Sequence, residues 1–320
     1  MISLEICSGA GGQALGLEQA GFDHAALIEI DEHCCATLRK NRPNWPVFGG
    51  GKAGDVSEFD ASPYHGKVDL LAGGIPCPPF SVAGKKLGEL DERNLFPETI
   101  RLVDEIRPRA VMVENVPGLL GAEFEQYRQR IRSLLKKLGY ETFWERLNAS
   151  DFGVPQVRPR AVLVAIERKV ADKFEWPKPL KIPAPTVADT IADLMASGGW
   201  KGAKEWIKTA QKLAPTIVGG SKKHGGPDLG PTRAKQAWAA LGVNGHLIGN
   251  EPPQPGFQGA PTLTVQMVAR LQGFPDDWQI TGKKTNAYRQ VGNAFPPPVA
   301  KAVGQQIIKC LSAARAKSAN

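Results

Sequence analysis

A cysteine stands between prolines in the segment GGIPCPPFSVAG, which covers residues 73–84. Each proline fixes its own φ near about −65° and restricts the residue before it, so Pro76 and Pro78 largely preset the direction of Cys77. A nucleophile that must reach one substrate atom in one geometry benefits from such rigidity, whereas a buried structural cysteine does not. Proline-rich loops are common, so this segment alone favours a structural loop, with covalent catalysis by the Cys77 thiolate as the alternative that the rest of the chain must decide.

A second chemical group is the carboxylate of Glu114, which ends the apolar segment AVMVENV at residues 110–116. Burying a carboxylate is costly unless it is paired or protonated. Desolvation raises the pKa of a carboxyl group, which would suit Glu114 to donate a proton to a ring nitrogen. The alternative is a structural glutamate held by backbone amides.

Two arginines alternate in QVRPR, residues 156–160, which begins with Gln156. Alternate residues of a strand point to the same face, so Arg158 and Arg160 are predicted to present two guanidinium groups together. Such a pair can clamp a phosphate or a carbonyl oxygen. The alternative is a charged strand edge.

Glycines crowd the segment EICSGAGG at residues 5–12. Gly9, Gly11 and Gly12 allow a ligand to approach the backbone closely and expose amides at the start of a helix. The pattern fits a turn that holds a nucleotide-like ligand, and it fits a plain tight turn equally well.

Acidic residues follow at the positions where a nucleotide site would need them. Glu29 and Asp31 come after the second apolar segment, about twenty residues beyond the glycines, where an acid can accept hydrogen bonds from ribose hydroxyls. The alternative is an acid that favours a helix N-terminus. Asp55, in GDV, is a candidate for contact with an adenine amine.

These motifs need a fold that brings them together. Residues 1–168 contain strand-like segments that alternate with helix-like segments. The strand-like segments are ISLEIC, HAALIEID, VDLLAGGIP, AVMVENV and PRAVLVAIE, and the helix-like segments are GGQALGLEQAGF, EHCCATLRKNRP, PETIRLVDEIRP and FEQYRQRIRSLLKKLGY. Alternation of this kind predicts an α/β fold with a doubly wound, mainly parallel, Rossmann-like sheet. Ligands bind beyond the carboxyl ends of such strands, and the glycine, acid, cysteine and Glu114 motifs all directly follow strands.

The chain beyond residue 168 changes character. Residues 169–260 are rich in proline and glycine and hold 12 Lys and Arg against 7 Asp and Glu, more than half of the net charge of +8. We predict a catalytic domain at 1–168, a smaller, loop-rich recognition domain at 169–260, and a helical segment at 261–320 that returns to the catalytic domain. A pI near 9.2 favours a polyanionic partner.

The five cysteines form an odd set without C-x-x-C spacing, so the sequence predicts neither a zinc site nor a disulfide framework. It also shows no stretch of about 18 apolar residues and no basic start followed by an apolar core. We expect a cytoplasmic protein without a metal or a membrane span, associated with the nucleoid when bound to DNA, and a monomer.

The sequence contains, in this order, the segments EICSGAGGQALG, LIEID, GDV, GGIPCPPFS, RNLFPE, ENVPG, QVRPR, RLQGFPDDW and RQVGNAFPP. Together these segments resemble the motifs of the C5-cytosine DNA methyltransferase family, of the compact restriction-modification kind. They span nearly the whole chain except the basic segment. The resemblance implies an S-adenosylmethionine-dependent enzyme that yields S-adenosylhomocysteine and acts on double-stranded DNA. A cognate restriction endonuclease acting on the same site, without a stable complex, would be a further partner.

The resemblance assigns a role to each matching residue. Cys77 is the implied nucleophile, Glu114 the acid at cytosine N3, Arg160 the group that positions the base near O2, and Arg158 a support for the catalytic loop and flanking phosphates. The cofactor site is implied to be lined by Ser8, Gly9, Ala10, Gly11, Gly12, Glu29, Ile30, Asp55, Val56, Pro76, Leu95 and Asn293. Where the family usually has Asp and an aromatic residue, this chain has Glu5 and Cys7, and Ile30 replaces another aromatic residue; we therefore expect a less aromatic adenine pocket.

The predicted DNA contacts lie in three places. The segment SVAGKKLG after Cys77 is a candidate for a loop that closes over DNA, and the segment GGSKKHGGPDLGPTRAKQAW is a candidate for sequence recognition. The third place is Gln156. The residues predicted to contact DNA in the two segments are Ser81, Lys85, Lys86, Lys222, Lys223, His224, Arg233 and Lys235. A solvated loop is the alternative for each of them.

The implied chemistry explains why these groups occur together. Cytosine C5 is a poor nucleophile until a thiolate adds at C6, and the charge that then develops over N3 and O2 calls for a protonated Glu and an Arg. The base must also leave the duplex stack. Three alternatives remain: a Rossmann oxidoreductase, a transfer-RNA cytosine-5 methyltransferase, and a catalytically inactive DNA-binding relative.

Overall fold

The computed structural model describes residues 1–76, 94–219 and 227–315, which form two compact units. Unit 1 comprises Met1–Leu147, Pro159–Lys178 and Val299–Asn320, and unit 2 comprises Asn148–Arg158 and Pro179–Pro298. This division differs from the predicted boundaries, because residues 148–158 and 261–298 belong to unit 2 and residues 169–178 belong to unit 1. The roles of the two units stay a prediction.

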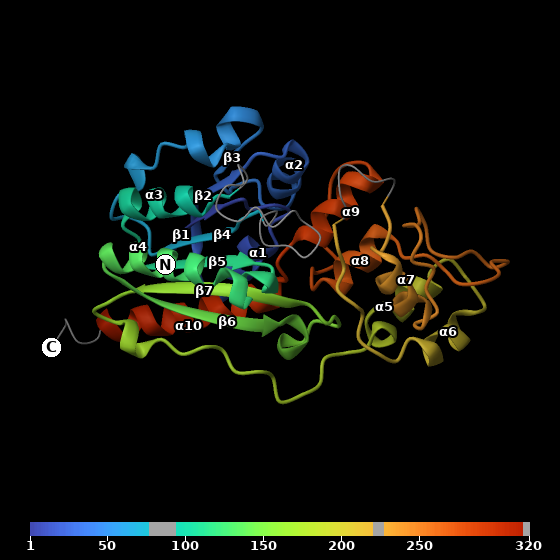
Figure 1. The fold of residues 1–320 in the computed structure, drawn as a ribbon. Helices are drawn as coiled ribbons and strands as arrows, with labels where there is room; N and C mark the ends of the chain where they lie inside the picture. The colour runs from blue at the N-terminus through green and yellow to red at the C-terminus, as the bar shows by residue number, and fades with distance from the viewer. Residues whose placement is uncertain (77–93, 220–226, 316–320) are drawn as a thin grey trace. The chain divides into compact units, whose positions relative to one another are not determined.

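A mixed seven-stranded sheet forms the centre of unit 1, in the order β3-β2-β1-β4-β5-β7-β6 (Figure 1). Its strands are β1 Ile2–Ile6, β2 Asp23–Glu29, β3 Val47–Gly49, β4 Leu70–Gly74, β5 Ala110–Asn115, β6 Tyr140–Asn148 and β7 Pro159–Glu167. The pairs joining β3, β2, β1, β4 and β5 are parallel, and β7 runs antiparallel to β5. The predicted α/β fold with a mainly parallel sheet is confirmed.

The helices of unit 1 connect the strands and cover the sheet. They are α1 Gly12–Ala20, α2 Glu32–Asn41, α3 Phe96–Ile106, α4 Glu125–Lys137 and α10 Pro297–Arg315, whose first two residues belong to unit 2. Short 3-10 turns lie at η1 Gly51–Gly54, η2 Val56–Glu58, η3 Ser62–Tyr64, η5 Pro117–Leu120, η6 Ala122–Phe124, η7 Ala149–Phe152 and η8 Ala171–Lys173.

The buried core follows from the alternation of side chains along the strands. Leu4 and Ile6 of β1, with Val111 and Val113 of β5, point to one face, where the apolar side chains of α3 and α4 pack on them. Their neighbour Glu5 lies in the same strand but takes the opposite direction. On β1 the sequence therefore places a carboxyl group where an apolar residue would be expected.

The order of the strands decides where a ligand can bind. The chain moves outward from β1 through β2 to β3, then returns to β4 on the other side of β1. The carboxyl ends of β1 and β4 thus flank the point where the strand order reverses, which is where ligands bind in open α/β sheets. The glycine-rich turn after β1 and the segment that leads to Cys77 after β4 both lie there.

Two strands, β3 and β6, were not predicted from the sequence. β3 has only three residues, so it has no detectable alternation. β6, YETFWERLN, is the edge strand beside β7, and its Tyr, Thr, Phe and Trp have high strand propensity. That enrichment was a usable signal.

Unit 2 is built from short helices and irregular connections. The helices are α5 Val187–Ala196, α6 Ala203–Thr209, α7 Thr232–Ala239, α8 Val265–Leu271 and α9 Lys284–Asn293. Thr186 and Thr264 cap α5 and α8 by accepting hydrogen bonds from the backbone N–H groups of Asp189 and Met267. Helix α8 packs against both α5 and α9.

Candidate active site

The turn after β1 has the conformation that its glycines allow. Gly9 and Gly11 have φ values of 52° and 83°, in the left-handed region that favours glycine, and Cys7 before them also has a positive φ of 52°. Gly11 is the N-cap of α1, and its N–H donates to the carbonyl of Ser8 at 3.0 Å. A Cβ added at Gly9 would meet no atom within 4 Å, so the backbone is open to a ligand there.

Glu29 at the end of β2 is tied directly to this turn. Its Oε2 accepts a hydrogen bond from the N–H of Gly9 at 2.7 Å, and its Oε1 accepts one from the N–H of Asp31 at 2.8 Å. Burial raises the pKa of Glu29, and the two backbone N–H groups partly offset that effect. The carboxyl group is thus held in one orientation beside the glycine turn.

The other predicted residues of the glycine turn are buried, but the residue after Glu29 is exposed. Ser8 and Ala10 are buried, and the Ser8 hydroxyl donates to the carbonyl of Glu5. Ile30 has 56% of its surface exposed, which is unusual for a large apolar side chain. An apolar surface beside an oriented carboxyl suits one face of a flat ring.

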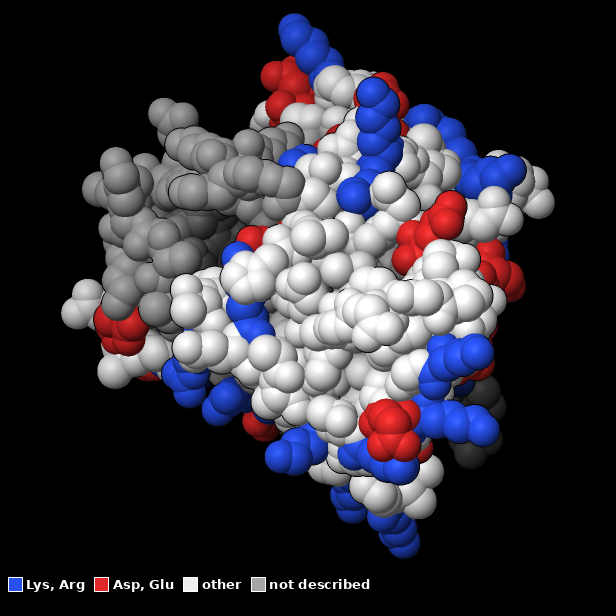
Figure 2. Space-filling model, turned by 90° about the vertical axis from the view of Figure 1, so that its right-hand side faces the viewer, with Lys and Arg blue, Asp and Glu red and all other residues white. Residues whose placement is uncertain are grey.

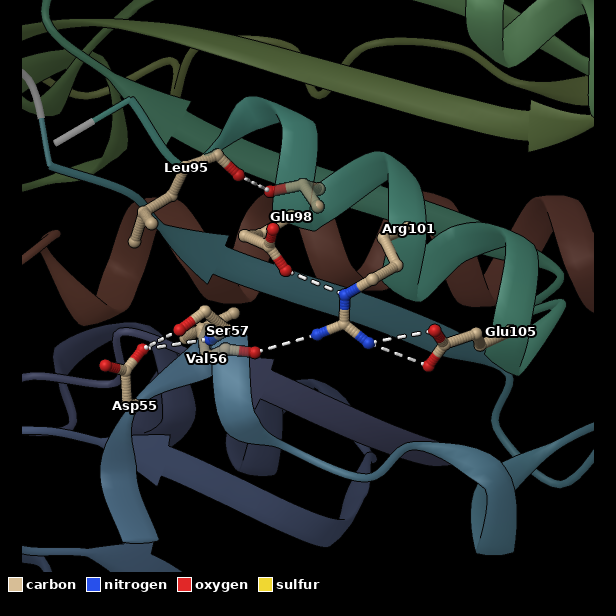
Figure 3. A network of polar contacts seen from close by, with 8 residues as sticks. Asp55, Val56, Ser57, Leu95, Glu98, Arg101 and Glu105 are labelled. Atoms are coloured by element: carbon tan, nitrogen blue, oxygen red, sulfur yellow. Dashed lines mark hydrogen bonds and ion pairs between the residues drawn. The ribbon is translucent and has the colours of Figure 1, made fainter. Parts of the chain in front are cut away.

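Asp55 lies on the connection after β3. Its Oδ1 accepts hydrogen bonds from the N–H and the hydroxyl of Ser57, at 2.9 and 2.7 Å, and these bonds lower the pKa of Asp55 (Figure 3). Val56 beside it is buried, and a Cβ added at Gly54 would lie 2.0 Å from the carbonyl oxygen of Glu29. The connection therefore lies directly against the end of β2.

Leu95 and Pro76 flank the part of the chain that contains Cys77. Leu95 is the N-cap of α3, and its carbonyl accepts hydrogen bonds from the N–H and the hydroxyl of Thr99 (Figure 3). Pro76 is exposed two residues after the end of β4. Both residues therefore lie beyond the carboxyl ends of the parallel strands, as a cofactor site would require.

Glu114 and Arg160 form an ion pair in unit 1. Nε of Arg160 lies 2.7 Å from Oε1 of Glu114, and both side chains are largely buried. Glu114 also lies close to the end of β4, because its Oε2 would be 3.5 Å from a Cβ added at Gly74. The sequence predicted a protonated Glu114 or one held by backbone amides; the structure adds the guanidinium of Arg160 as a partner.

The predictions for Arg158 and Gln156 need correction. Arg158 is 1% exposed in unit 2, and its guanidinium donates to the carbonyls of Ile217, Gly292 and Ala294. A charge buried on main-chain carbonyls cannot clamp a phosphate together with Arg160, which instead pairs with Glu114.

Gln156, predicted to contact DNA, is fully buried in the same unit. Its Oε1 accepts from the N–H of Ile217 at 2.9 Å, and its Nε2 donates to Oε1 of Gln272 at 2.8 Å. Gln156 therefore joins the segment before β7 to the end of α8. This role is structural, since no atom of the side chain is accessible to DNA.

Asn293, a predicted cofactor residue, is exposed at the end of α9. A Cβ added at Gly219 would lie 2.0 Å from its Oδ1, so the backbone at Gly219 closely approaches this side chain. Both residues belong to unit 2. A cofactor contact for Asn293 stays a prediction.

Besides the buried Gln156, two of the predicted DNA contacts are described, both at the start of α7. Arg233 is exposed, whereas Nζ of Lys235 lies 2.6 Å from Oδ2 of Asp228. Figure 2 shows Lys and Arg side chains spread around a broad uncharged area, with acidic side chains between several of them. The described positive charges on that face do not form one continuous stripe. The remaining predicted residues lie outside the described ranges; these are Cys77, Ser81, Lys85, Lys86, Lys222, Lys223 and His224.

The thiols of Cys7, Cys35 and Cys310 are poor candidates for a nucleophile. Burial, together with Glu29 and Glu5, raises the pKa of Cys7. Burial raises the pKa of both Cys35 and Cys310 to about 11. Thiols that stay protonated near neutral pH are unreactive, which leaves the proline-flanked Cys77 as the stronger candidate.

The described residues contain neither a membrane-spanning helix nor a metal-binding cluster. No helix among them has the length and apolar character needed to cross a membrane. Within the same ranges, no three His, Cys, Asp or Glu side chains lie together in a way that would hold a metal ion.

Comparison with known proteins agrees with this geometry. A family model described as C-5 cytosine-specific DNA methylase matches residues 1–309. The type II methyltransferase M.NaeI of Lentzea aerocolonigenes is 55% identical over 312 residues, which cover 97% of this chain and 75% of that protein. The type II methyltransferase M.NgoMIV of Neisseria gonorrhoeae is 51% identical over 318 residues, covering 97% of each protein.

A solved structure, the methyltransferase EhMeth of Entamoeba histolytica, matches with a TM-score of 0.67 and 14% identity, covering 97% of this chain and 98% of that one. At such low identity the likeness shows the fold alone. The family model and the two relatives carry the assignment, and they confirm the resemblance seen in the sequence. The chain therefore belongs to the family of C-5 cytosine-specific DNA methylases.

Proposed function

We propose that this enzyme uses S-adenosylmethionine to methylate C5 of a cytosine flipped out of double-stranded DNA, and that it protects the DNA from a cognate restriction endonuclease. The observation that carries the proposal is the buried Glu114–Arg160 pair, which lies at the carboxyl end of β5 and the amino end of β7, close to Gly74 at the end of β4. Relatives named as type II methyltransferases support the restriction-modification context.

The residues of unit 1 fit the cofactor. The turn is open above Gly9, the Glu29 carboxyl is oriented to accept ribose hydroxyls, and the apolar surface of Ile30 is exposed for a ring. Asp55 keeps a carboxylate available for an exocyclic amine because its pKa is lowered. The other residues proposed to line this site in unit 1 are Ser8, Ala10, Gly11, Gly12, Val56, Pro76 and Leu95. A cofactor contact of Asn293 is also proposed.

When bound, S-adenosylmethionine supplies an electrophilic methyl group on a sulfonium. The protein must make cytosine nucleophilic enough to accept it. Addition of the Cys77 thiolate to C6 forms a C–S bond and pushes the electron pair of the C5–C6 double bond toward N3 and O2. When the base separates Glu114 from Arg160, Glu114 takes up a proton and gives it to N3, while the guanidinium of Arg160 stabilises the charge at O2.

The enamine-like C5 then carries the new methyl group, and a base removes the C5 proton. The electron pair from that C–H bond re-forms the C5–C6 double bond, and the Cys77 thiolate leaves. The Glu114 carboxyl takes back its proton from N3, so the enzyme returns to its starting state. Each of these steps needs access to both faces of the base, which a stacked duplex does not allow.

The decisive experiment compares the wild type with Cys77→Ser. Wild type should transfer label from S-adenosylmethionine to duplex DNA and not to transfer RNA, and Cys77→Ser should lose turnover while still binding DNA. A duplex carrying 5-fluorocytosine at the target should trap the wild type covalently, since a fluorine at C5 blocks elimination. Labelling of transfer RNA alone would favour the RNA-directed alternative, and methylation by Cys77→Ser would contradict the mechanism.

A further inference from the structure

Arg101 on α3 connects the cofactor side of unit 1 to the helix that follows the predicted catalytic loop. Its Nε donates to Oε2 of Glu98 at 2.7 Å, and its Nη1 donates to both carboxylate oxygens of Glu105, at 2.9 and 2.8 Å (Figure 3). Its Nη2 donates to the carbonyl oxygen of Val56 at 2.8 Å, across 45 residues of sequence. Every nitrogen of the guanidinium therefore has an acceptor.

The two glutamates fix the direction in which Arg101 points. They lie three residues before it and four after it, which places all three side chains on one side of the helix. A guanidinium is planar, so carboxylates on two of its edges leave the third N–H group aimed in one direction. Figure 3 shows that this direction is toward the main chain at Val56.

Val56 is the first residue of η2, and Asp55 is its N-cap. Within this turn the carbonyl of Val56 accepts only a long hydrogen bond, from the N–H of Phe59 at 3.4 Å. The bond from Arg101 is much shorter and is strengthened by the charge of the guanidinium. The same peptide group carries the N–H of Ser57, which donates to Oδ1 of Asp55, so its rotation must break the bond from Arg101 and disturb the bond to Asp55.

Asp55 has one oxygen engaged within the turn and one available. Its Oδ1 accepts from Ser57, and Figure 3 shows the second oxygen directed away from Ser57. We propose that Arg101 is a positioning residue for the cofactor: it holds the Val56 carbonyl so that Asp55 meets the 6-amino group of the adenine ring. The inference rests on the proposed function, because it concerns the same S-adenosylmethionine site.

A purely structural role would predict a different pattern of effects. Helix-surface ion pairs of side chains that are about one-third exposed, as here, contribute little to folding. Loss of Arg101 should therefore leave the fold intact and act on cofactor binding. Since the chemistry occurs at cytosine and not at adenine, turnover at saturating cofactor should change little.

The test measures binding of S-adenosylmethionine and S-adenosylhomocysteine by calorimetry without DNA, and kcat and KM with DNA. Arg101→Met should weaken S-adenosylhomocysteine binding by about 10- to 100-fold, the usual effect of losing a hydrogen bond to a charged group. It should raise KM for S-adenosylmethionine similarly and leave kcat within about two-fold. Arg101→Lys should rescue only part of the loss, because one ammonium cannot reproduce the fork.

Arg42→Met is the matched control. Arg42 is similarly exposed and forms a bidentate pair with Glu18 elsewhere in unit 1, through Nε and Nη2 at 2.8 Å each. Its removal eliminates an ion pair of the same type away from the turn at Asp55. Binding of both ligands by Arg42→Met should stay within about two-fold of wild type.

A ligand lacking the 6-amino group separates positioning from general loosening. With the S-adenosylhomocysteine analogue that carries hydrogen at that position, the penalty of Arg101→Met should fall to about two-fold or less, because the partner of Asp55 is gone. An equal penalty on both ligands, or wild-type affinity for both, would overturn the inference. Should Arg101→Met fail to fold, Glu105→Gln must show a smaller loss with the same dependence on the amino group. A wild type that binds neither natural ligand would contradict the proposed function instead.

Discussion

The Nε atom of Arg160 lies 2.7 Å from Oε1 of Glu114, joining the neighbouring antiparallel strands β7 and β5. The two residues proposed to act on the neighbouring N3 and O2 atoms of the cytosine ring edge therefore neutralise each other before the base arrives. A flipped base must enter between partners that already interact. The pair consequently keeps two buried charges in place and sets the geometry that the base will meet.

Replacing either partner should impair catalysis strongly, and replacing both should cost less than the sum. Glu114→Gln removes the acid at N3 and should lower kcat by about 10²- to 10⁴-fold. Arg160→Met leaves the Glu114 carboxylate without its cation and should lower kcat to a similar degree. The double variant should show a coupling of about 0.5–3 kcal/mol in single-turnover rates, as expected for residues in contact.

Two further measurements separate a loss of catalysis from a loss of folding. Circular dichroism and S-adenosylhomocysteine binding should be unchanged in Glu114→Gln, since a neutral amide replaces a carboxyl of the same shape. Strictly additive losses in the double variant would mean that the ion pair has no part in the reaction.

Arg158 should matter for the stability of unit 2 and not for contact with phosphates. Arg158→Met would leave the carbonyls of Ile217, Gly292 and Ala294 without their donor. Breaking a buried charged network typically costs about 3 to 5 kcal/mol, so the urea midpoint should fall sharply. Arg168→Met removes an exposed pair with Glu141 and should shift the midpoint very little. A stable Arg158→Met protein with weakened DNA binding would favour the role first expected from the sequence.

Sequence patterns predicted the sheet well because its signals are local. The helix of residues 125–137 carries its apolar side chains at helical spacing, with Tyr127, Ile131 and Leu135 buried. The glycine turn needs positive φ values at Gly9 and Gly11, and glycine is the residue that tolerates them. The carboxyl ends of parallel strands then gather the motifs without further information.

The partners of individual side chains were not predictable in this way. Arg158 and Arg160 alternate in sequence, but one is buried on main-chain carbonyls and the other pairs with Glu114. These partners lie far from both arginines in the sequence, so the local spacing of the arginines does not predict them. The spacing of Glu98, Arg101 and Glu105 can be read from the sequence, but the hydrogen bond from Arg101 to the carbonyl of Val56 depends on the fold.

Contacts of α7 with DNA should appear in the salt dependence of non-specific binding. Arg233 is exposed, and Asp228 restrains the charge of Lys235. If Arg233 neutralises one phosphate, Arg233→Gln should reduce the slope of log K against log salt by about 0.9. Asp228→Asn should tighten binding by releasing Lys235, whereas Lys309→Gln on α10 should serve as a neutral control. An unchanged slope in Arg233→Gln would remove this residue from the DNA contacts.

The buried carboxyl of Glu5 should make stability depend on pH. Glu5 is fully buried, and neither of its oxygens has a hydrogen-bond partner among the residues that the structure describes. Burial raises the pKa of Glu5 well above its usual value near 4.5; the nearby Gln13 amide opposes that shift and the charge of Glu29 adds to it. Glu5 therefore keeps its proton in the folded state at pH values where the unfolded chain has lost it.

The sign of the pH effect follows from this difference. Below about pH 4.5 the carboxyl is protonated in both states. As the pH rises, only the unfolded carboxyl ionises, so the free energy of unfolding falls until the folded pKa is passed. Glu5→Gln has nearly the same shape and no charge, and should be more stable than wild type at pH 8 by roughly 1 to 3 kcal/mol. Urea unfolding should show that advantage shrinking toward pH 4.5, whereas the exposed Glu141→Gln should show none at either pH. A Glu5→Gln protein less stable than wild type at pH 8 would mean that the ionised carboxylate has a partner in the folded chain.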